Sequence, residues 1–441
     1  MKDVEKVVKR HIKQGFEYEI FFQRTKKTKV EVSDEKLENL SRSEESGVGI
    51  RVLKDKRIGF SYTTSMDENS LKDVVEKAME MCELQPADKG NVFLKERTEA
   101  NANSVFDREG IDVPLEEKIE FTLGLERQAK KEDKRIKGVR KASFTEGIFE
   151  VSMKNSFGVE FSYEGTYFSA MISALAQSNN DSAISWEFRA TRRFSELDSK
   201  DLVSDAVFKS VSLLNPEPLQ TRVMPVVFFR ESFAMLLEVF STMFLGDSYV
   251  KGKTLLTDKV DERIASELVT VVDDGTLEGG FLTTPYDAEG VPKQKNLVID
   301  KGTFKGFLHS LYTAEQSGEK PTGNSERGSF KSLPVSGITN LYIEPGSIKF
   351  EELVRSEKEV FMVLELMGLH TVDPISGEFS LGASGILYRD GKPAHAVRGV
   401  TVAGNVLDLL DKIVAVGDDL KFYGNVGSPS ILVKDITVGG S

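Results

Sequence analysis

Apolar positions in the N-terminal part of the chain follow two periods, one typical of helices and one typical of strands. In residues 2–14 and 67–83 they recur every three or four positions, which predicts two amphipathic helices. Apolar runs bounded by polar turns predict four strands, at residues 16–24, 27–33, 46–54 and 57–63. The first 84 residues therefore combine helices with strands.

A polar, irregular segment at residues 85–112 is predicted to be a linker to a second region. Pro114 is placed to start the next helix, because proline is tolerated in the first helical turn. Residues 142–192 then show the alternation of an antiparallel meander. A helix is predicted to follow from about residue 198 to residue 214.

Two prolines mark the clearest domain boundary, because proline cannot continue a helix. They stand directly after the predicted helix, in the run Asn215-Pro216-Glu217-Pro218. We therefore predict two domains. An N-terminal α+β domain spans 1–215 and consists of subregions at about 1–84 and 113–215; a C-terminal β-rich domain spans 219–441.

The stretch from Val223 to Thr254 has the pattern of a buried strand followed by a helix. The apolar run from Val223 to Phe229 is short enough to be a buried strand. The next apolar residues recur at spacings of three and four, as in a helix: Phe233, Leu236, Leu237, Phe240 and Phe244. Gly246-Asp247 is predicted to end this helix and begin a loop. A strand that leads into a helix and a polar loop is a common place for catalytic residues.

Short strands and turns dominate the rest of the chain. Three dipeptides predict hairpin turns: Asp274-Gly275, Lys301-Gly302 and Asp390-Gly391. One helix is predicted at about residues 406–414. Helices and strands that are grouped rather than regularly alternating are typical of α+β proteins. We predict an α+β fold of two domains, with mixed helices and largely antiparallel sheets.

The composition narrows the class of protein. The chain has 441 residues and a formal net charge of −12, which argues against a dedicated nucleic-acid-binding protein, because those carry a basic surface. Cys82 is the only cysteine, so neither an internal disulfide nor a cysteine-rich metal site is available. No apolar run approaches the roughly 18 residues that cross a membrane. Because the N-terminus has the pattern of a helix rather than a signal peptide, we expect a cytoplasmic protein.

The sequence contains no complete catalytic motif of a common hydrolase. The histidines are far apart, and none is paired at the helical spacing of a zinc hydrolase: His11, His309, His370 and His395. Residues 382–386 lack the second glycine of a serine-hydrolase elbow. Residues 246–254 lack the spacing of a phosphate-binding loop. Asp273 and Asp274 precede Gly275 and fit a turn better than a general acid and base.

Several longer runs resemble the TldD/PmbA family. One is SGVGIRVLKDKRIGFSYTT near the N-terminus; the others lie in the C-terminal part and read DDGTLEGGF, YDAEGVPKQKNLVIDKGTFKGFLHSLYTAEQ, PTGNSERG, GLHTVDPISGEFSLGASGILYRDGKPAHAVRGVTVAGN and LKFYGNVGSPSILVKDITVGG. They occur in the family's order and span nearly the whole chain. The resemblance implies a two-domain α+β protein that pairs with a second member of the family.

The resemblance also implies where zinc would bind. The TldD branch is a cytoplasmic metalloprotease that takes unfolded peptides into the interior of its dimer. Its helix corresponding to residues 230–243 carries His-Glu and then another His, and a cysteine in a Gly-Thr-Cys-Gly run completes the site. Here the helix contains Arg230, Glu231 and Glu238 but no histidine, and Val426 stands about where the cysteine would be. Two carboxylates cannot replace two imidazoles and a thiolate for zinc, so the sequence resembles the PmbA, or TldE, branch, which supplies no metal ligands.

We therefore expect a PmbA/TldE-like subunit of a TldD/TldE-type peptidase, without catalytic residues of its own. It would bind no cofactor, and zinc is expected in a TldD-like partner; alone, the chain would form a symmetric dimer. Unfolded peptide would bind largely as an added strand. Two loops are expected to shape the chamber or the interface: Asp273, Asp274 and Gly275 in one, and Gly323, Asn324 and Arg327 in the other.

Two other functions stay open from the sequence, which leaves unresolved whether the chain is itself an enzyme. The chain could be an autonomous metallopeptidase with unconventional ligands, such as His309 or His370 with nearby carboxylates. It could also be a non-enzymatic regulator, because the family has been described as modulating DNA gyrase. The acidic balance argues against direct DNA binding but does not exclude binding to gyrase itself.

Overall fold

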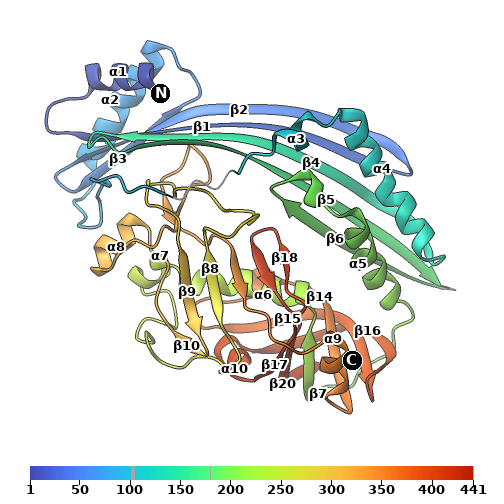
Figure 1. The fold of residues 1–441 in the computed structure, drawn as a ribbon. Coiled ribbons are helices and arrows are strands. Elements are labelled where there is room, and N and C mark those ends of the chain that lie inside the picture. The colour runs from blue at the N-terminus through green and yellow to red at the C-terminus, as the bar shows by residue number, and fades with distance from the viewer. Residues whose placement is uncertain (101–104, 179, 441) are drawn as a thin grey trace.

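A computed structural model describes residues 1–100, 105–178 and 180–440 of the chain. Its N-terminal half is organised around one antiparallel six-stranded sheet in the order β3-β2-β1-β4-β5-β6. The strands are β1 (Glu17–Ser33), β2 (Lys36–Lys54), β3 (Arg57–Thr63), β4 (Ile136–Asn155), β5 (Glu160–Ser178) and β6 (Asp181–Thr191). Because β1 pairs with β4, the two N-terminal subregions share this sheet. The long strands form an arch over the C-terminal half (Figure 1).

The two faces of this sheet have different partners. Ile20 packs with helices at one end, α1 (Lys2–His11) and α2 (Glu68–Leu84), and Val30 packs with α4 (Leu115–Glu132) and α5 (Ser199–Ser212) toward the other. A short helix, α3 (Arg108–Asp112), precedes α4. Phe21, one residue along from Ile20, instead packs against the C-terminal residues Tyr286 and Phe330. Side chains alternate between faces along a strand, so β1 joins the helical layer to the C-terminal half.

The C-terminal half contains a ring of strands and a second sheet. The ring has the strand order β16-β15-β14-β7-β20, and it closes because β20 also pairs with β16. A sixth strand, β17, pairs with β20 as well. These strands are β7 (Arg222–Phe228), β14 (Glu359–Met367), β15 (Glu378–Arg389), β16 (Lys392–Asn405), β17 (Ile413–Val416) and β20 (Ile431–Gly439). The second sheet has the order β10 (Thr303–Phe304), β9 (Lys295–Asp300), β8 (Val271–Asp274), β13 (Leu341–Ile343), β19 (Val426–Ser428) and β18 (Lys421–Tyr423).

Short elements complete the C-terminal half. The helices are α6 (Arg230–Phe240), α7 (Gly246–Val250), α8 (Leu311–Ser317), α9 (Phe350–Arg355) and α10 (Val406–Asp411), and the strands β11 (Ser325–Glu326) and β12 (Val335–Ser336) form a separate pair. The 3₁₀ turns are Phe194–Glu196, Ser241–Phe244 and Leu369–Thr371. In the described residues, no helix is both long and apolar enough to span a membrane.

The predicted α+β class, with largely antiparallel sheets and a β-rich C-terminal half, is confirmed. The predicted division of the first hairpin is wrong, because residues 17–33 form one strand and its partner already begins at Lys36. Residues 36–45 are exposed throughout. A strand with both faces in solvent needs no apolar alternation, so the sequence pattern did not reveal it.

Three further sequence expectations are corrected. Asp274-Gly275 does not close a hairpin, because β9 begins only at Lys295, after a long loop. Gly246 does not lead into a loop: it begins α7, one residue after a 3₁₀ turn that extends the preceding helix. The helix at residues 406–414 ends at Asp411, where the chain turns into β17.

Candidate functional site

Helix α6 lies between the strand ring and the second C-terminal sheet. Strand β7 leads directly into it, and the Ser232 hydroxyl donates to the Val363 carbonyl on β14 at 3.0 Å. Its apolar face is buried through Phe233, Leu236, Leu237 and Phe240. On another side α6 contacts β19, which carries Val426. The helix and the glycine-flanked strand that the resemblance associates with zinc therefore lie together in the fold.

Glu231, in the first turn of α6, is held in a buried ion cluster. Its carboxylate pairs with the Lys209 ammonium from α5, and both side chains are nearly inaccessible. Lys209 also lies 3.0 Å from a carboxylate oxygen of Glu187 on β6. Its Nζ donates to the carbonyl of Trp186 at 2.6 Å. Lys209 thus joins a carboxylate of the N-terminal sheet to one of the C-terminal helix.

Burial shifts the protonation of this cluster. It raises the pKa of Glu231 to about 7; the Lys209 ammonium opposes the shift, and the nearby Glu187 carboxylate adds to it. Burial alone would lower the pKa of Lys209, but Glu187 and Glu231 together raise it. Lys209 is therefore charged at neutral pH, whereas Glu231 titrates near neutrality.

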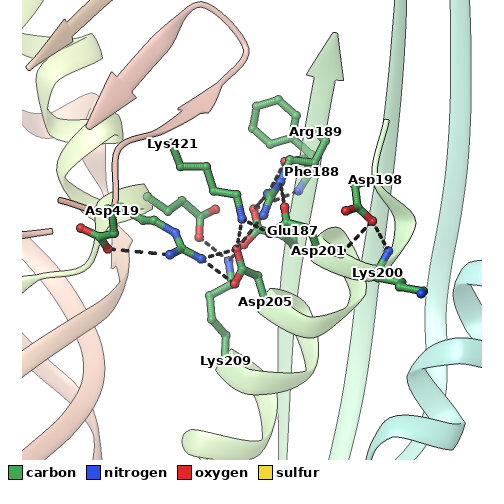
Figure 2. Close-up of polar contacts among 12 residues, drawn as sticks. Glu187, Phe188, Arg189, Asp198, Lys200, Asp201, Asp205, Lys209, Asp419 and Lys421 are labelled. Carbon is green, nitrogen blue, oxygen red and sulfur yellow. Dashed lines mark hydrogen bonds and ion pairs between the residues drawn. The ribbon is translucent and has the colours of Figure 1, made fainter. Parts of the chain in front are cut away.

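Arg230 extends the cluster to the neighbouring carboxylates. It pairs with Asp205 on α5 at 2.7 Å and lies 3.7 Å from Asp419. Asp205 also accepts hydrogen bonds from Arg189 at 2.6 Å and Lys421 at 2.8 Å (Figure 2). We name these connected residues the α6 ion network: Glu187, Arg189, Asp201, Asp205, Lys209, Arg230, Glu231, Asp419 and Lys421.

The residues at this position do not fit a zinc ion. Zinc sites in proteins use thiolate, imidazole and carboxylate ligands, whereas Arg230 and Lys209 are cations that occupy the carboxylates around them. Val426 offers only hydrocarbon and is buried. Glu238 is exposed on the far part of α6 and takes no part in the network. Within the described ranges, no group of three or more His, Cys, Asp or Glu side chains is arranged to hold a metal.

Within the described residues, the histidines of the unconventional-ligand alternative take no part in the α6 ion network or in a group of metal-ligating side chains. His309 is buried beside the rings of Phe307 and Tyr249, and its Nδ1 lies 3.2 Å from the Thr313 hydroxyl. Burial lowers the pKa of His309. His370 is exposed in a 3₁₀ turn. Both have ordinary structural surroundings.

The structure brings together parts of the two predicted loops. The buried Asp273 carboxylate accepts hydrogen bonds from the Asn324 amide at 2.7 Å and the Thr339 backbone N–H at 2.6 Å. Gly323 has a φ of +71°, and a side chain there would meet the Pro292 carbonyl oxygen at 2.5 Å. Only a residue without a Cβ fits this close approach.

The other residues of the two loops lie nearby with different roles. Asp274 accepts a hydrogen bond from the Thr276 backbone N–H at 2.8 Å, and the Gly275 N–H donates to the Gln294 carbonyl at 3.0 Å. The Arg327 side chain is buried against Glu19 of β1, with which it forms an ion pair. Arg327 also lines a cavity of about 480 Å³ between the arch and the C-terminal loops. Of the two predicted loops, only the second reaches this cavity.

Sequence reasoning missed most of the ion network. Lys209, Glu187 and Asp205 lie on predicted elements, but each looks like an ordinary polar residue in sequence. Lys209 sits among small and apolar residues in KSVSLL, which was the one available signal that it is buried. The contacts themselves join segments that are far apart in sequence, and no local pattern encodes them.

The comparisons with known proteins agree with this architecture. Models of the PmbA/TldA metallopeptidase match domain 1 at residues 18–82, the central domain at 108–214 and the C-terminal domain at 221–440. The fold and these matches define a metallopeptidase-related α+β protein. The chain belongs to the PmbA/TldD family.

Relatives from both branches match over most of their length. The metalloprotease PmbA of Escherichia coli O157:H7 is 27% identical over 92% of this chain and 88% of its own. A metalloprotease TldD homologue of Buchnera aphidicola is also 27% identical, over 90% and 87%. An uncharacterised protein of Methanocaldococcus jannaschii is 26% identical over 98% and 99%. Overall identity therefore does not separate the branches.

Two solved structures share the whole fold. TldE from Thermococcus kodakarensis is 25% identical, with a TM-score of 0.90 over 100% of both chains. A Thermotoga maritima protein, named as a proposed modulator of a DNA gyrase, is 26% identical with a TM-score of 0.91 over 99% of both chains.

Proposed function

We propose that this chain is the metal-free, PmbA/TldE-like subunit of a cytoplasmic TldD/TldE-type peptidase. It would complete a closed chamber around unfolded peptides and position a TldD-like partner that carries the zinc. The observation that carries the proposal is the content of the first turn of α6. There, Arg230 and Glu231 are engaged by Asp205 and Lys209 in the α6 ion network.

This observation argues against catalysis by the chain itself. A carboxylate that activates water must reach the reacting atoms, but Glu231 is buried and paired with Lys209. The network also stabilises the contact between the two halves, because α5 and β6 lie on one side and α6 and β18 on the other. In this proposal, the helix that would carry the catalytic motif instead connects the two halves of the chain through ion pairs.

An edge strand of the arch supports the proposed mode of peptide binding. Within the described residues, β6 pairs in its sheet only with β5. Side chains occupy the carbonyls of Ser182, Trp186 and Phe188 on this strand, so a peptide strand would pair with the remaining backbone groups of its other edge. Ile184 and Trp186 are 45% and 42% exposed on this strand. Backbone hydrogen bonds to an added strand give affinity that tolerates many sequences, as an unfolded-peptide substrate requires.

The test is peptide cleavage by this chain with and without a His-Glu-bearing family member, each stripped of metal and then supplied with zinc. We expect cleavage only when the partner and zinc are both present, and faster than with the partner alone. Cleavage by the isolated, metal-stripped chain would overturn the proposal. Stoichiometric zinc in tag-free protein would favour the autonomous metallopeptidase instead.

A matched pair of variants locates the catalytic carboxylate. Glu231→Gln in this chain preserves the shape of the side chain and removes its charge, and we expect cleavage by the pair to be unchanged. The same change at the glutamate of the partner's His-Glu motif should abolish cleavage. A large loss of activity from Glu231→Gln, in a chain that still binds its partner, would show that Glu231 takes part in the reaction.

A further inference from the structure

The cavity under the arch contains a buried cation without a counter-ion. Arg192, just past the end of β6, is only 6% exposed and lines the cavity. Two of its nitrogens donate to the carbonyls of Thr166 at 3.0 Å and Thr283 at 3.2 Å, whereas Nε has no partner in the described part of the chain. No carboxylate of the described residues pairs with it. Burial accordingly lowers the pKa of Arg192 to about 10.

Unsatisfied donors also belong to the second predicted loop. Nε and Nη1 of Arg327 and the Ser325 hydroxyl are buried, and they find no hydrogen-bond partner among the described residues. All three residues, Arg192 included, line the same cavity. Leaving a buried donor unpaired costs about 1–3 kcal/mol for each group. Arg192, Ser325 and Arg327 thus bring buried donors without a partner among the described residues to the wall of one cavity.

The acidic side chains of the cavity interact with a different cation, Lys293. Asp287 accepts hydrogen bonds from the backbone N–H groups of Glu289, Val291 and Ser325, so its oxygens are already occupied. The charges of Asp287 and Glu326 act on Lys293. Arg192 lies apart from these charges in the balance of the cavity, because no carboxylate of the described residues forms an ion pair with it or shifts its pKa.

Aromatic rings form part of the cavity wall next to Arg192. The Arg192 guanidinium lies 5.0 Å from the ring centre of Phe149 and 5.7 Å from that of Phe281. Tyr167 packs against Phe281 with ring centres 6.2 Å apart. Such a wall accommodates an apolar group next to the cation, and about 480 Å³ is within the usual range of about 300–1,000 Å³ for ligand pockets.

We infer that this cavity binds a carboxylate attached to an apolar or aromatic group, with the carboxylate on Arg192 and the apolar group among the rings. The source that fits the proposed peptide chamber, on which this step rests, is the C-terminal residue of a peptide. Backbone amides carry no full negative charge, whereas a free C-terminus does. Recognition of the C-terminal carboxylate in this cavity is therefore distinct from binding of peptide backbone along a strand edge.

Calorimetric titration of the isolated full-length chain tests the inference. The probes are N-acetyl-Ala-Ala-Phe with a free carboxylate, the same peptide with a C-terminal amide, and 3-phenylpropionate. We expect the free acid to bind roughly tenfold tighter than the amide or better, as for a hydrogen bond to a charged group. We expect 3-phenylpropionate to bind more weakly than the peptide acid. This assay needs no catalytic partner. The carboxylate site can therefore fail this test while the proposed subunit role holds, and the subunit role can fail while the carboxylate site holds.

Three variants locate the binding. Arg192→Gln should remove the preference for the acid, whereas Arg193→Gln, at the exposed next residue, should preserve it. Thr25→Glu, which places a carboxylate on the cavity wall without removing Arg192, should weaken binding of the acid more than of the amide. Thermal melting verifies that each variant is folded, and Thr25→Glu serves if Arg192→Gln does not fold.

The remaining outcomes contradict the inference. Equal affinity for acid and amide, or no binding of either, would mean that solvent alone occupies the cavity. A preference for the acid that survives Thr25→Glu and Arg192→Gln would place the site elsewhere. Binding of 3-phenylpropionate as tightly as the peptide acid would retain the carboxylate site and overturn the peptide C-terminus as its source.

Discussion

The α6 ion network and the cavity under the arch bury charges in opposite ways. In the network every cation has a carboxylate: Lys209 lies between Glu187 and Glu231, and Arg230 pairs with Asp205. At the cavity, Arg192 is equally buried but has only backbone carbonyls and aromatic rings around it. The first region is electrostatically complete without a ligand, and the second is not.

This difference distinguishes two roles of a buried charge, one functional and one structural. Perturbed ionisable groups gather at functional sites, but structural ion networks perturb them as well. Here the helix that the sequence resemblance associates with zinc holds the structural ion network. The cation without a carboxylate partner among the described residues, Arg192, lies where the sequence shows no recognisable motif. Counter-ion balance, rather than the size of a pKa shift, therefore distinguishes the two regions.

The largest effect is expected from Lys209→Met, which breaks the centre of the network. Glu231 would lose its ion pair with Lys209 while still buried, and breaking a buried ion pair by removing one partner typically costs about 3–5 kcal/mol of unfolding free energy. Lys200→Met, at an exposed position of α5, is the control. Urea denaturation can be followed through Trp186, the only tryptophan, whose ring lies 5.6 Å from the Lys209 ammonium. A cost below about 1 kcal/mol would show that the network is solvated.

The second prediction concerns pH, because each region holds a carboxylate whose pKa is raised to about 7. Burial raises the pKa of Glu231 to about 7, and it raises that of Asp287 to about 7 with help from the neighbouring Glu289. A carboxyl group whose pKa is higher in the folded state favours folding when protonated. This contribution is full below the unfolded pKa and is lost as pH rises through 7.

The matched variants separate the two contributions between pH 5 and pH 8. Glu231→Gln should remove up to about 2–3 kcal/mol of the loss of stability over this range. The remaining loss from Asp287 should disappear when Asp287→Asn is added. His309, whose pKa burial lowers, acts in the opposite direction, so the comparison is between wild type and variants. Identical slopes for wild type and Glu231→Gln would contradict the raised pKa.

Much of this architecture is accessible from sequence, and the limits are physical. The β7–α6 unit could be predicted because apolar periodicity records burial on one face. The expectation that Arg230 and Val426 replace zinc ligands rests on a motif, which is local in sequence. The partners of Arg230 could not, since Asp205 and Asp419 reach it only through the tertiary fold.

The cavity is a clearer example of contacts that cannot be predicted from the sequence. Arg327 lies in a loop that the family resemblance singled out, but Arg192 lies in the run ATRRF beside Arg193, and nothing in sequence tells which of the two is buried. The alternation that would decide it ends there, because β6 stops at Thr191.

A third, smaller effect is expected from Arg192→Met. The change removes donors from the Thr166 and Thr283 carbonyls but strands no charge, because no carboxylate depended on Arg192. We expect a loss of about 1–2 kcal/mol in unfolding free energy, well below that of Lys209→Met. The same urea denaturation compares the two. A cost as large as that of Lys209→Met would imply an anionic partner for Arg192 that the present contacts do not contain.

The smallest effect is expected from Lys421→Gln, at the more solvated side of the network. Lys421 pairs with Asp201 and Asp205, but Arg189 also contacts both carboxylates, and Arg230 contacts Asp205. Because each carboxylate keeps a cation, we expect a loss of only about 0.5–1 kcal/mol, typical of a partly exposed pair.

This redundancy distinguishes the outer network from its centre, where Lys209 is the one cation among the described residues that forms an ion pair with Glu231. A double change, Lys421→Gln with Arg230→Gln, should therefore cost more than the sum of the single changes, since Asp205 would then depend on Arg189 alone. Urea denaturation of the four chains of this cycle measures the excess. Strict additivity would mean that the carboxylates act independently. The charges of the network would then lie close together without stabilising one another. In that case their pairing would not distinguish them energetically from Arg192.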